Sequence, residues 1–254
     1  MSNVSISTNN LTIGYGSTVI QRDLTFSLSE GEMVCMLGPN GCGKSTLLRT
    51  LAGLQPALKG TYSLSSSLQD KSGEASKNIA LVLTERLSMD NTTVHDVVAL
   101  GRYPYSSFLD GLKEEDERII AMSLEQVGFT PSPPGEGWGE ANTFFNAHSD
   151  GEKQRILIAK ALAQQTPIIL LDEPTAHLDL PHRILILRLL RRLAHEQKKT
   201  VLISTHELDL ALALSDRILL MTPNKGIQLD TAANLKKTDA FTSAFSMDIF
   251  NPLG

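Results

Sequence analysis

A glycine-rich stretch at residues 38–46, with the sequence GPNGCGKST, leaves this chain few possible folds. It matches the pattern G-x-x-x-x-G-K-[ST] at every fixed position. The apolar run at 33–37 predicts a buried strand, and residues 46–54 predict a helix that closes at Gly53. Strand, glycine loop and helix in this order are the structural context that the pattern requires.

The residue types in this stretch suit the phosphates of a nucleotide. Glycines let backbone N–H groups turn onto phosphate oxygens, and the following helix points its positive end at the anion. We expect Lys44 to contact the β- and γ-phosphates and the Ser45 hydroxyl to coordinate Mg²⁺. The candidate nucleotide contacts are Gly38, Pro39, Asn40, Gly41, Cys42, Gly43, Lys44, Ser45 and Thr46.

One member of the stretch, Cys42, raises a separate question. It lies at the start of the expected helix and beside Lys44, and both features lower the pKa of a thiol and favour the reactive thiolate. One hypothesis is therefore that alkylation of Cys42 blocks nucleotide binding. The alternative, which we prefer, is an inert small residue that merely fits the loop.

A second chemical signal is the acidic pair Asp172-Glu173, which follows the apolar run 168–171. The carboxyl ends of parallel strands place ligands, so Asp172 is expected to hold Mg²⁺ through water. Glu173 is then positioned to polarise the attacking water as a general base. The alternative is a strand followed by an acidic helix cap, but the glycine loop upstream favours the catalytic interpretation.

Composition narrows the class of protein. A chain of 254 residues, 41% hydrophobic and 20% charged, suits one large α/β domain or a core with an inserted lobe. Its two cysteines fit a reduced, cytosolic protein and are too few for a zinc site. A net charge of -5 and a pI of about 5.7 argue against a dedicated nucleic-acid binder. Neither a signal peptide nor an apolar run of roughly 20 residues is visible, so a partner would have to cross any membrane.

Strands that alternate with helices predict a mostly parallel sheet. Strands are expected at 4–13, 24–28, 33–37, 79–83, 168–171, 200–204 and 217–221. Helices are expected at 46–54, 94–100, 114–127, 149–164, 184–198 and 208–214. The apolar face of the helix 114–127 would consist of Ile119, Ile120, Met122, Leu124 and Val127. Residues 131–139, rich in proline and glycine, predict a surface loop without a binding role.

A third signal, Ser149-Asp150-Gly151-Glu152, opens the expected helix 149–164. Taken alone, it is a capping box of the S-x-x-E type. Its order in the chain, after the glycine loop and before Asp172-Glu173, resembles that of the ABC ATPases, whose signature reads Leu-Ser-Gly-Gly-Gln. Ser149 and Gly151 match this signature, whereas His148, Asp150 and Glu152 depart from it. The resemblance makes Ser149, Gly151 and Glu152 nucleotide contacts.

The resemblance extends over nearly the whole chain. It implies that Tyr15 stacks on adenine, that Asp179 couples two nucleotide sites, and that His206 contacts the γ-phosphate. One position departs: the family places a glutamine after the strand 79–83, where this chain has Thr84 and Glu85. Thr84 could reach the metal only through a water, and Glu85 is a candidate substitute.

The fold that the resemblance implies is α/β. It consists of a P-loop ABC ATPase core with a mostly parallel sheet, an N-terminal antiparallel β-subdomain and an inserted α-helical subdomain. Residues 1–254 would form one ABC ATPase domain, with 1–84 and 165–254 as the core and 85–164 as the helical part. The implied cofactors are ATP and Mg²⁺. The implied partners are a second copy of the chain, integral membrane permease subunits and an upstream substrate-binding protein, without nucleic acid, and the place of work is the cytoplasmic face of the cell membrane.

Two further segments favour a subclass. Residues 101–105 (GRYPY) and the ending around 245–248 resemble the importer ATPases for iron chelates, haem and cobalamin. No membrane domain or large regulatory domain is visible, which also favours an importer. Alternatives stay open: an exporter or lipoprotein-release motor, a soluble ABC protein acting on DNA or ribosomes, and a degenerate subunit that does not hydrolyse ATP.

The other ionisable residues suggest no further site. His95, His182 and His195 are scattered without metal-ligand spacing, and we interpret them as surface or structural residues. The basic side chains on the expected helix 184–198 fit a solvated polar face: Arg188, Arg191, Arg192 and Lys198.

Overall fold

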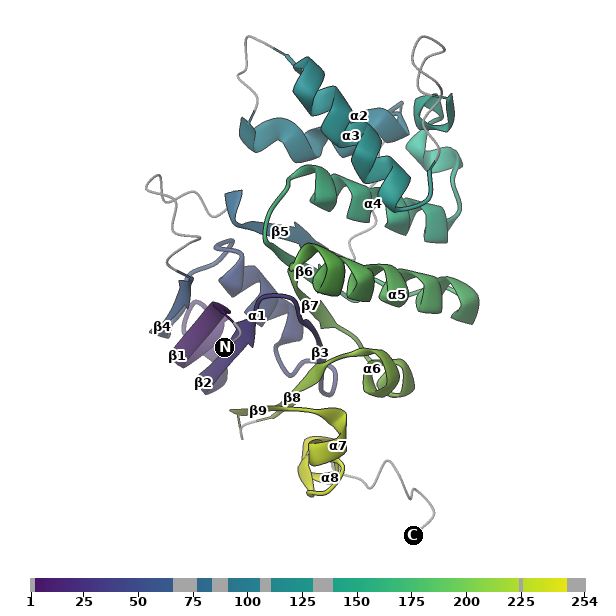
Figure 1. Ribbon diagram of the computed structural model, residues 1–254. Coiled ribbons are helices and arrows are strands. Elements are labelled where there is room, and N and C mark those ends of the chain that lie inside the picture. Colours follow the sequence, from purple (N-terminus) through teal and green to yellow (C-terminus); the bar gives the residue numbers. More distant parts are fainter. Residues whose placement is uncertain are drawn as a thin grey trace.

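The computed structural model describes residues 3–65, 77–83, 91–105, 111–129, 139–223 and 226–245 (Figure 1). The strands are β1 (Val4–Tyr15), β2 (Thr18–Ser29), β3 (Met33–Leu37), β4 (Lys59–Leu64), β5 (Ile79–Val82), β6 (Ile168–Asp172), β7 (Thr200–Ser204), β8 (Arg217–Thr222) and β9 (Gly226–Asp230). The α-helices are α1 (Lys44–Leu51), α2 (Val94–Ala99), α3 (Glu114–Gln126), α4 (Asp150–Ala163), α5 (Leu180–Gln197), α6 (Leu208–Leu214), α7 (Ala232–Leu235) and α8 (Ala240–Phe245). Short 3₁₀ helices cover Leu100–Tyr105, Gly139–Asn142 and Phe145–Ala147.

The larger sheet has six strands in the order β5-β6-β7-β3-β8-β9. Its pairs are parallel except for β8 with β9, which run antiparallel. Strands β3, β6 and β7 are buried at every position, as expected of parallel strands that are covered on both faces. Because β3, β6 and β7 run the same way, the segments that follow them emerge at one edge of the sheet.

A smaller antiparallel sheet, in the order β2-β1-β4, covers one face of the larger one. Along β3, alternate side chains enter two different cores. Val34 and Met36 join the core formed with the small sheet and α1, which includes Ile6, Leu28 and Leu48. The phosphate-loop helix α1 is therefore packed between the two sheets.

The opposite face of the larger sheet is covered by helices. Met33, Cys35 and Leu37 of β3 point into this second core, which continues into α4 and α5. Figure 1 shows α2 and α3 beyond α4, at the end of the molecule away from the small sheet. No helix in the described part of the chain is long and apolar enough to cross a membrane.

Most expected elements are present, but several differ in extent; strand β2, for example, begins at Thr18 rather than 24. Strands β4 and β9 and helices α7 and α8 have no counterpart among the expected elements. Helix α5 begins at Leu180 rather than 184, because Asp179 caps it and a proline occupies its first turn. Helix α1 ends at Leu51, before Gly53. Met122 was expected on the apolar face of α3 but is 58% exposed, so that prediction was wrong.

Parts of other expectations lie outside the described residues. These are the Thr84-Glu85 pair, residues 246–248 and residues 131–138 of the segment rich in proline and glycine. The last residue of that segment, Gly139, is described and begins a 3₁₀ helix. The hypotheses about them stay predictions.

A buried ion pair joins the segment after α2 to α3 and to the end of α4. Arg102, in the 3₁₀ helix after α2, donates from Nε to Asp116 Oδ1 at 2.8 Å, and both side chains are less than a tenth exposed. Arg102 also donates to the carbonyl of Ala163 and to Gln165 Oε1 beyond the end of α4. The N–H of Lys113 and then Arg102 hold the pKa of Asp116 below its ordinary range by hydrogen bonding to the carboxylate.

We predict that Asp116→Ala lowers the free energy of unfolding by about 3–5 kcal/mol, because it leaves the Arg102 guanidinium buried without its counter-charge. The matched control is Glu114→Ala on the same helix, which removes an exposed pair with Arg118 and should cost about 0–1 kcal/mol. Urea unfolding of both variants measures the difference. Equal losses would show that the buried pair contributes no more than a surface one.

Candidate functional site

The carboxyl edge of the larger sheet brings the strongest sequence signals together. Strand β3 lies between β7 and β8, and β7 lies between β3 and β6. The glycine loop leaves β3, the pair Asp172-Glu173 leaves β6, and His206 follows β7 by two residues. Residues more than 120 positions apart in sequence therefore share one edge.

The glycine loop after β3 fits closely against its surroundings. Gly43 caps α1 with a φ of 103°, and a Cβ atom there would lie 2.8 Å from Ile20 Cγ2. Gly38 passes so close to the chain that a Cβ atom would lie 2.6 Å from the Met221 carbonyl oxygen. Two glycines are thus required by space or backbone angle, which matches the close backbone approach that phosphate binding needs.

Lys44 curls back over this loop. Its Nζ donates to the carbonyl oxygens of Gly38 at 2.9 Å and Pro39 at 3.2 Å, and the residue is buried. Ser45 next to it is exposed, so its hydroxyl is open to a ligand. The loop thus presents an ammonium, a free hydroxyl and the N-terminus of α1 in one place.

The acidic pair is held by a residue that the sequence analysis missed. Ser204, the last residue of β7, donates its hydroxyl to Asp172 Oδ1 at 2.5 Å. The N–H of Glu173 donates to the Ser204 hydroxyl at 2.9 Å and to its carbonyl at 3.1 Å. Glu173 has a φ of 46°, a left-handed conformation that needs such support in a residue other than glycine.

Two more expected residues lie beside these groups. His206 Nδ1 is 3.5 Å from Glu173 Oε2, with the imidazole more than half exposed. Tyr15 accepts a hydrogen bond from the Thr46 hydroxyl at 3.2 Å, and about half of the tyrosine is exposed. An aromatic face is therefore available next to the glycine loop.

The signature segment forms a second group. Ser149 caps α4: its hydroxyl accepts from the N–H of Glu152, whose carboxylate accepts from the Ser149 N–H at 2.9 Å and hydroxyl at 2.7 Å. These contacts confirm the expected capping box. They also hold the pKa of Glu152 below its ordinary range, the Ser149 hydroxyl first and then its N–H.

The Asp179 loop lies against the signature. Asp179 caps α5 by accepting from the N–H of His182 at 3.2 Å, and it pairs with the His182 ring. A Cβ atom on Gly151 would lie 3.0 Å from Cδ2 of that ring. His182 therefore connects Asp179 to Gly151, a structural role for a residue that looked scattered in sequence.

These two groups lie apart within one chain. Figure 1 shows the N-terminal end of α4 on the side of the molecule opposite α1 and the small sheet. The start of α4, which carries the signature, therefore lies away from the glycine loop of the same chain.

Comparison with known proteins settles the family. Residues 21–176, more than half of the chain, match the ABC transporter family. The chain belongs to this family of ATP-binding transporter proteins.

Individual relatives agree. The iron(3+)-hydroxamate import ATP-binding protein FhuC of Bacillus subtilis is 37% identical over 246 residues, 96% of this chain and 88% of the relative. The ferric enterobactin transport ATP-binding protein FepC of Escherichia coli is 35% identical over 217 residues, 85% of this chain and 77% of the relative. A solved inward-facing ABC transporter assigned to the metal-chelate type superposes with a TM-score of 0.83 at 29% identity, covering 96% of this chain and 90% of that one.

Family membership confirms three expectations. The fold class is that of an ABC ATPase, with a mostly parallel sheet, an antiparallel β part and a helical part. The protein is an ATPase and binds ATP. A cassette 26% identical to this chain, with a TM-score of 0.70, has been solved as a dimer bound to ADP and Pi.

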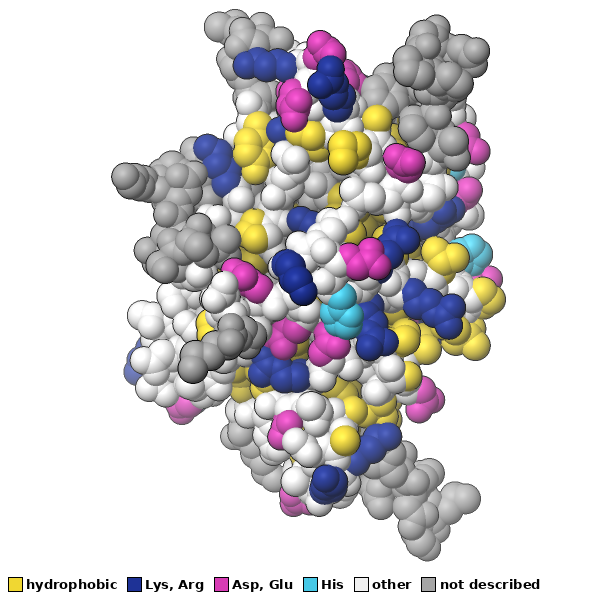
Figure 2. Space-filling view, viewed as in Figure 1, with side chains coloured by type: hydrophobic (Ala, Val, Ile, Leu, Met, Phe, Trp, Pro, Cys, Tyr) yellow, Lys and Arg dark blue, Asp and Glu magenta, His cyan; other side chains and the backbone are white. Residues whose placement is uncertain are grey.

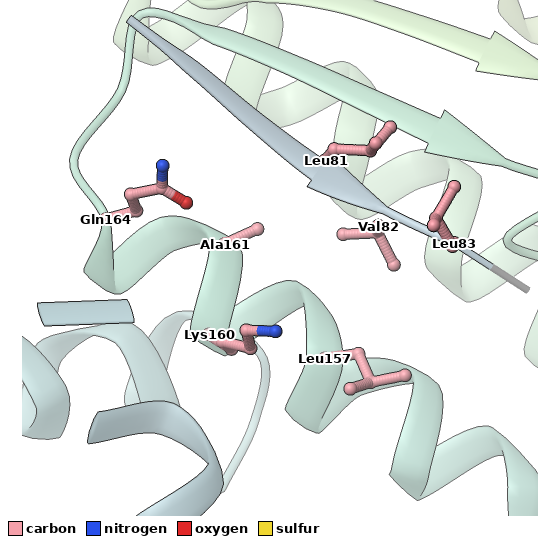
Figure 3. A pocket seen from close by; sticks show the side chains of 7 residues that line it. All are labelled: Leu81, Val82, Leu83, Leu157, Lys160, Ala161 and Gln164. Carbon is pink, nitrogen blue, oxygen red and sulfur yellow. The ribbon is translucent and has the colours of Figure 1, made fainter. Parts of the chain in front are cut away.

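Beside the second half of α4, this ABC ATPase has a cavity of about 190 Å³ between α4 and β5 (Figure 3). Leu157 and Ala161 of α4 face Val82 and Leu83 across it, and Lys160 lies among these apolar side chains. Burial lowers the pKa of Lys160. Leu83 is the last described residue before the segment that begins with Thr84.

The hypothesis that the pKa of the Cys42 thiol is lowered was wrong. Cys42 is 5% exposed, and burial raises the pKa of its thiol although Lys44 acts in the opposite direction. Cys35 is fully buried with a pKa raised to about 12. The environment therefore supports the inert interpretation.

We predict that neither thiol of the folded protein reacts with an alkylating agent near pH 7 on the timescale on which the urea-unfolded chain reacts. ATP binding should survive the treatment. Peptide mapping after labelling identifies which cysteine was modified. Fast labelling of Cys42 that ATP prevents would contradict the expectation.

We predict that Ser204→Ala lowers the rate of ATP hydrolysis by roughly 10–100-fold, as is typical when a partner that orients an active-site carboxylate is lost. ATP affinity should change much less, because the Ser204 hydroxyl bonds Asp172 and Glu173 and not the glycine loop. The control is Ser215→Ala, whose hydroxyl donates to the Ala211 carbonyl at the end of α6 and hydrogen-bonds the Cys35 thiol, away from the acidic pair. A parallel loss in both variants would indicate a general effect on stability.

Proposed function

We propose that this ATPase powers import of an iron chelate or a similar metal complex through a separate membrane permease. The supporting observation is the assembly of Lys44, Asp172, Glu173 and His206 at one sheet edge, within a chain whose relatives carry such import functions in their names. Besides hydroxamate and enterobactin, they include the achromobactin transport protein CbrD of Dickeya dadantii, 33% identical over 246 residues.

In this proposal the sheet edge holds Mg·ATP. Residues 38–46 surround the phosphates, Lys44 neutralises the β- and γ-phosphates, and Tyr15 stacks on adenine. The Ser45 hydroxyl and the Asp172 carboxylate are oxygen donors of the kind that Mg²⁺ prefers, and Thr84 is a third candidate from the sequence alone. The ion, when bound, neutralises charge that develops on the phosphates.

Glu173 acts as the general base. Its carboxylate is about a third exposed, its backbone is fixed by Ser204, and His206 lies 3.5 Å from it. This arrangement lets Glu173 accept a proton from the attacking water while His206 contacts the γ-phosphate. The intact set of groups argues against a degenerate subunit that does not hydrolyse ATP.

A second copy completes the site. The signature serine lies away from the glycine loop of its own chain, and Ser149 starts a helix of 14 residues whose positive end can face an anion. We infer a homodimer in which Ser149, Gly151 and Glu152 of one subunit face the ATP held by the other, with Asp179 at the contact between the two sites. The ADP-bound dimeric cassette supports this arrangement.

The remaining assignments follow from the same proposal. Residues 1–84 and 165–254 would act as the core and 85–164 as the helical part that responds to the permease. The protein would work at the cytoplasmic face of the cell membrane with a substrate-binding protein upstream.

Lys and Arg side chains are interspersed with Asp and Glu on the face in Figure 2. This mixture fits the acidic net charge and offers no support for a nucleic-acid partner. An exporter remains the alternative, and the permease that co-purifies with the chain distinguishes the two.

We predict that Glu173→Gln binds ATP normally but loses hydrolysis by about 10²–10⁴-fold, because the amide cannot accept the proton. With ATP and Mg²⁺ the variant should elute from a sizing column as a dimer. The matched control is Glu196→Gln on the exposed side of α5, which should behave as wild type. Hydrolysis by Glu173→Gln at the wild-type rate would disprove the assignment of the base.

A further inference from the structure

The signature of this chain begins with a histidine where the family pattern has leucine, and the structure gives that histidine specific contacts. His148 Nε2 lies 2.7 Å from the Thr143 hydroxyl, and Nδ1 lies 3.7 Å from Glu152 Oε2. The ring meets Phe129 edge-on at 5.6 Å between centroids, and only 13% of the side chain is exposed. A leucine could reproduce the contact with Phe129 but neither polar contact.

The partner of Thr143 fixes which nitrogen carries the proton. The Thr143 hydroxyl donates its single proton to the carbonyl oxygen of Glu140. Towards His148 the same oxygen can therefore only accept, so Nε2 is the protonated nitrogen. The segment that carries Thr143 is fixed in turn, because the N–H of Val94 donates to the Thr143 carbonyl at 2.9 Å.

With Nε2–H fixed, Nδ1 is the nitrogen that gains or loses a proton, and it faces a carboxylate. In the neutral ring, Nδ1 carries a lone pair 3.7 Å from Glu152 Oε2, and the two electron-rich atoms repel each other. In the imidazolium, Nδ1–H and Glu152 attract each other. Oε2 is the same oxygen that accepts both hydrogen bonds from Ser149.

We propose that His148 is a proton-dependent positioning residue for the signature serine. Protonated at Nδ1, it holds the Glu152 carboxylate on Ser149 and so fixes the start of α4. Neutral, it pushes the carboxylate away and loosens the cap. The consequence for catalysis rests on the proposed role of Ser149 towards the ATP of the partner subunit.

The charges around His148 favour this direction. From α4 they are the carboxylate of Glu152 and the guanidinium of Arg155. Arg155 lies over the Phe129 ring, 5.1 Å from its centroid, and donates to the Val127 carbonyl. Phe129 contributes an uncharged ring, and Glu140 meets this cluster through its backbone carbonyl. The carboxylate is thus the ionic group nearest to Nδ1.

The first experiment compares wild type with His148→Gln, which keeps a polar side chain that does not titrate. ATP hydrolysis at saturating ATP is measured from about pH 6 to about pH 8.5, the range in which histidines change charge. Because the imidazolium stabilises the cap only while it is protonated, the ratio of wild-type to variant rate should fall about two- to fivefold as the pH rises, the effect of a partly exposed ion pair. The control, His195→Gln, removes a histidine from another carboxylate pair, with Asp216, and its ratio should stay flat.

The second experiment changes the partner that fixes the proton. In Thr143→Val the neutral ring is free to carry its proton on Nδ1 and to donate it to Glu152. The ratio of the Thr143→Val rate to the His148→Gln rate should therefore fall less with pH than the ratio for wild type. Nitrogen NMR of the histidine ring gives a readout that needs no activity. In wild type the neutral ring should be the Nε2–H tautomer, and in Thr143→Val a substantial fraction should become Nδ1–H.

Three results would overturn the proposal: a ratio for His148→Gln that is constant with pH, a Thr143→Val profile identical to wild type, or an Nδ1–H tautomer in the wild-type protein. Each differs from failure of the proposed function, which would appear as wild-type protein that shows no ATP-dependent dimer. The NMR measurement still tests the position of the proton in that case.

Discussion

The parallel hydrogen-bond ladder β6-β7-β3 is the element on which the rest of the site depends. It places Asp172 opposite Ser204 and sets the glycine loop after the neighbouring strand. A shift of one residue in the β6-β7 register would turn the Ser204 hydroxyl to the other face of the sheet and remove its bond to the Asp172 carboxylate. Full burial of all three strands makes such a shift costly, because apolar side chains enter a core on each face. The position of the acidic pair is thus a consequence of sheet packing.

Helix caps form a second layer of positioning. Ser149 caps α4 and Asp179 caps α5, and both are residues that the proposed mechanism directs towards nucleotide or towards the contact between subunits. A capping side chain is held by the backbone of its own helix, so its direction is set without a contact from elsewhere in the fold. His148 and His182 each place an imidazole beside one of these caps. Local helix chemistry therefore supplies orientation, while the two-sheet core supplies location.

The sequence predicts those parts in which short-range chemistry dictates the structure. The glycine loop, the capping box at Ser149 and the buried strands were found because turn geometry, capping and apolar runs leave a local pattern. Ser204 was missed, since a serine at the end of a buried strand gains meaning only from the neighbouring strand, 32 residues away in the chain. The less favoured hypothesis of a reactive Cys42 failed for the same reason: its local neighbours lower the thiol pKa, but burial raises it and has the larger effect. Strands β4 and β9 are largely not buried, so they lack the apolar pattern by which the others were predicted.

The two cores also bear on how nucleotide binding could reach the helical part. The alternating side chains of β3 enter both cores, and the strand ends directly before the glycine loop. On one face lies α1, whose N-terminus would meet the phosphates in the proposed site. On the other lie α4 and α5, which begin at Ser149 and Asp179. Among the helices, Arg102 joins α3 to the end of α4 through its bonds to Asp116 and to the Ala163 carbonyl. Buried side chains therefore pack continuously from β3 through α4 to α2 and α3.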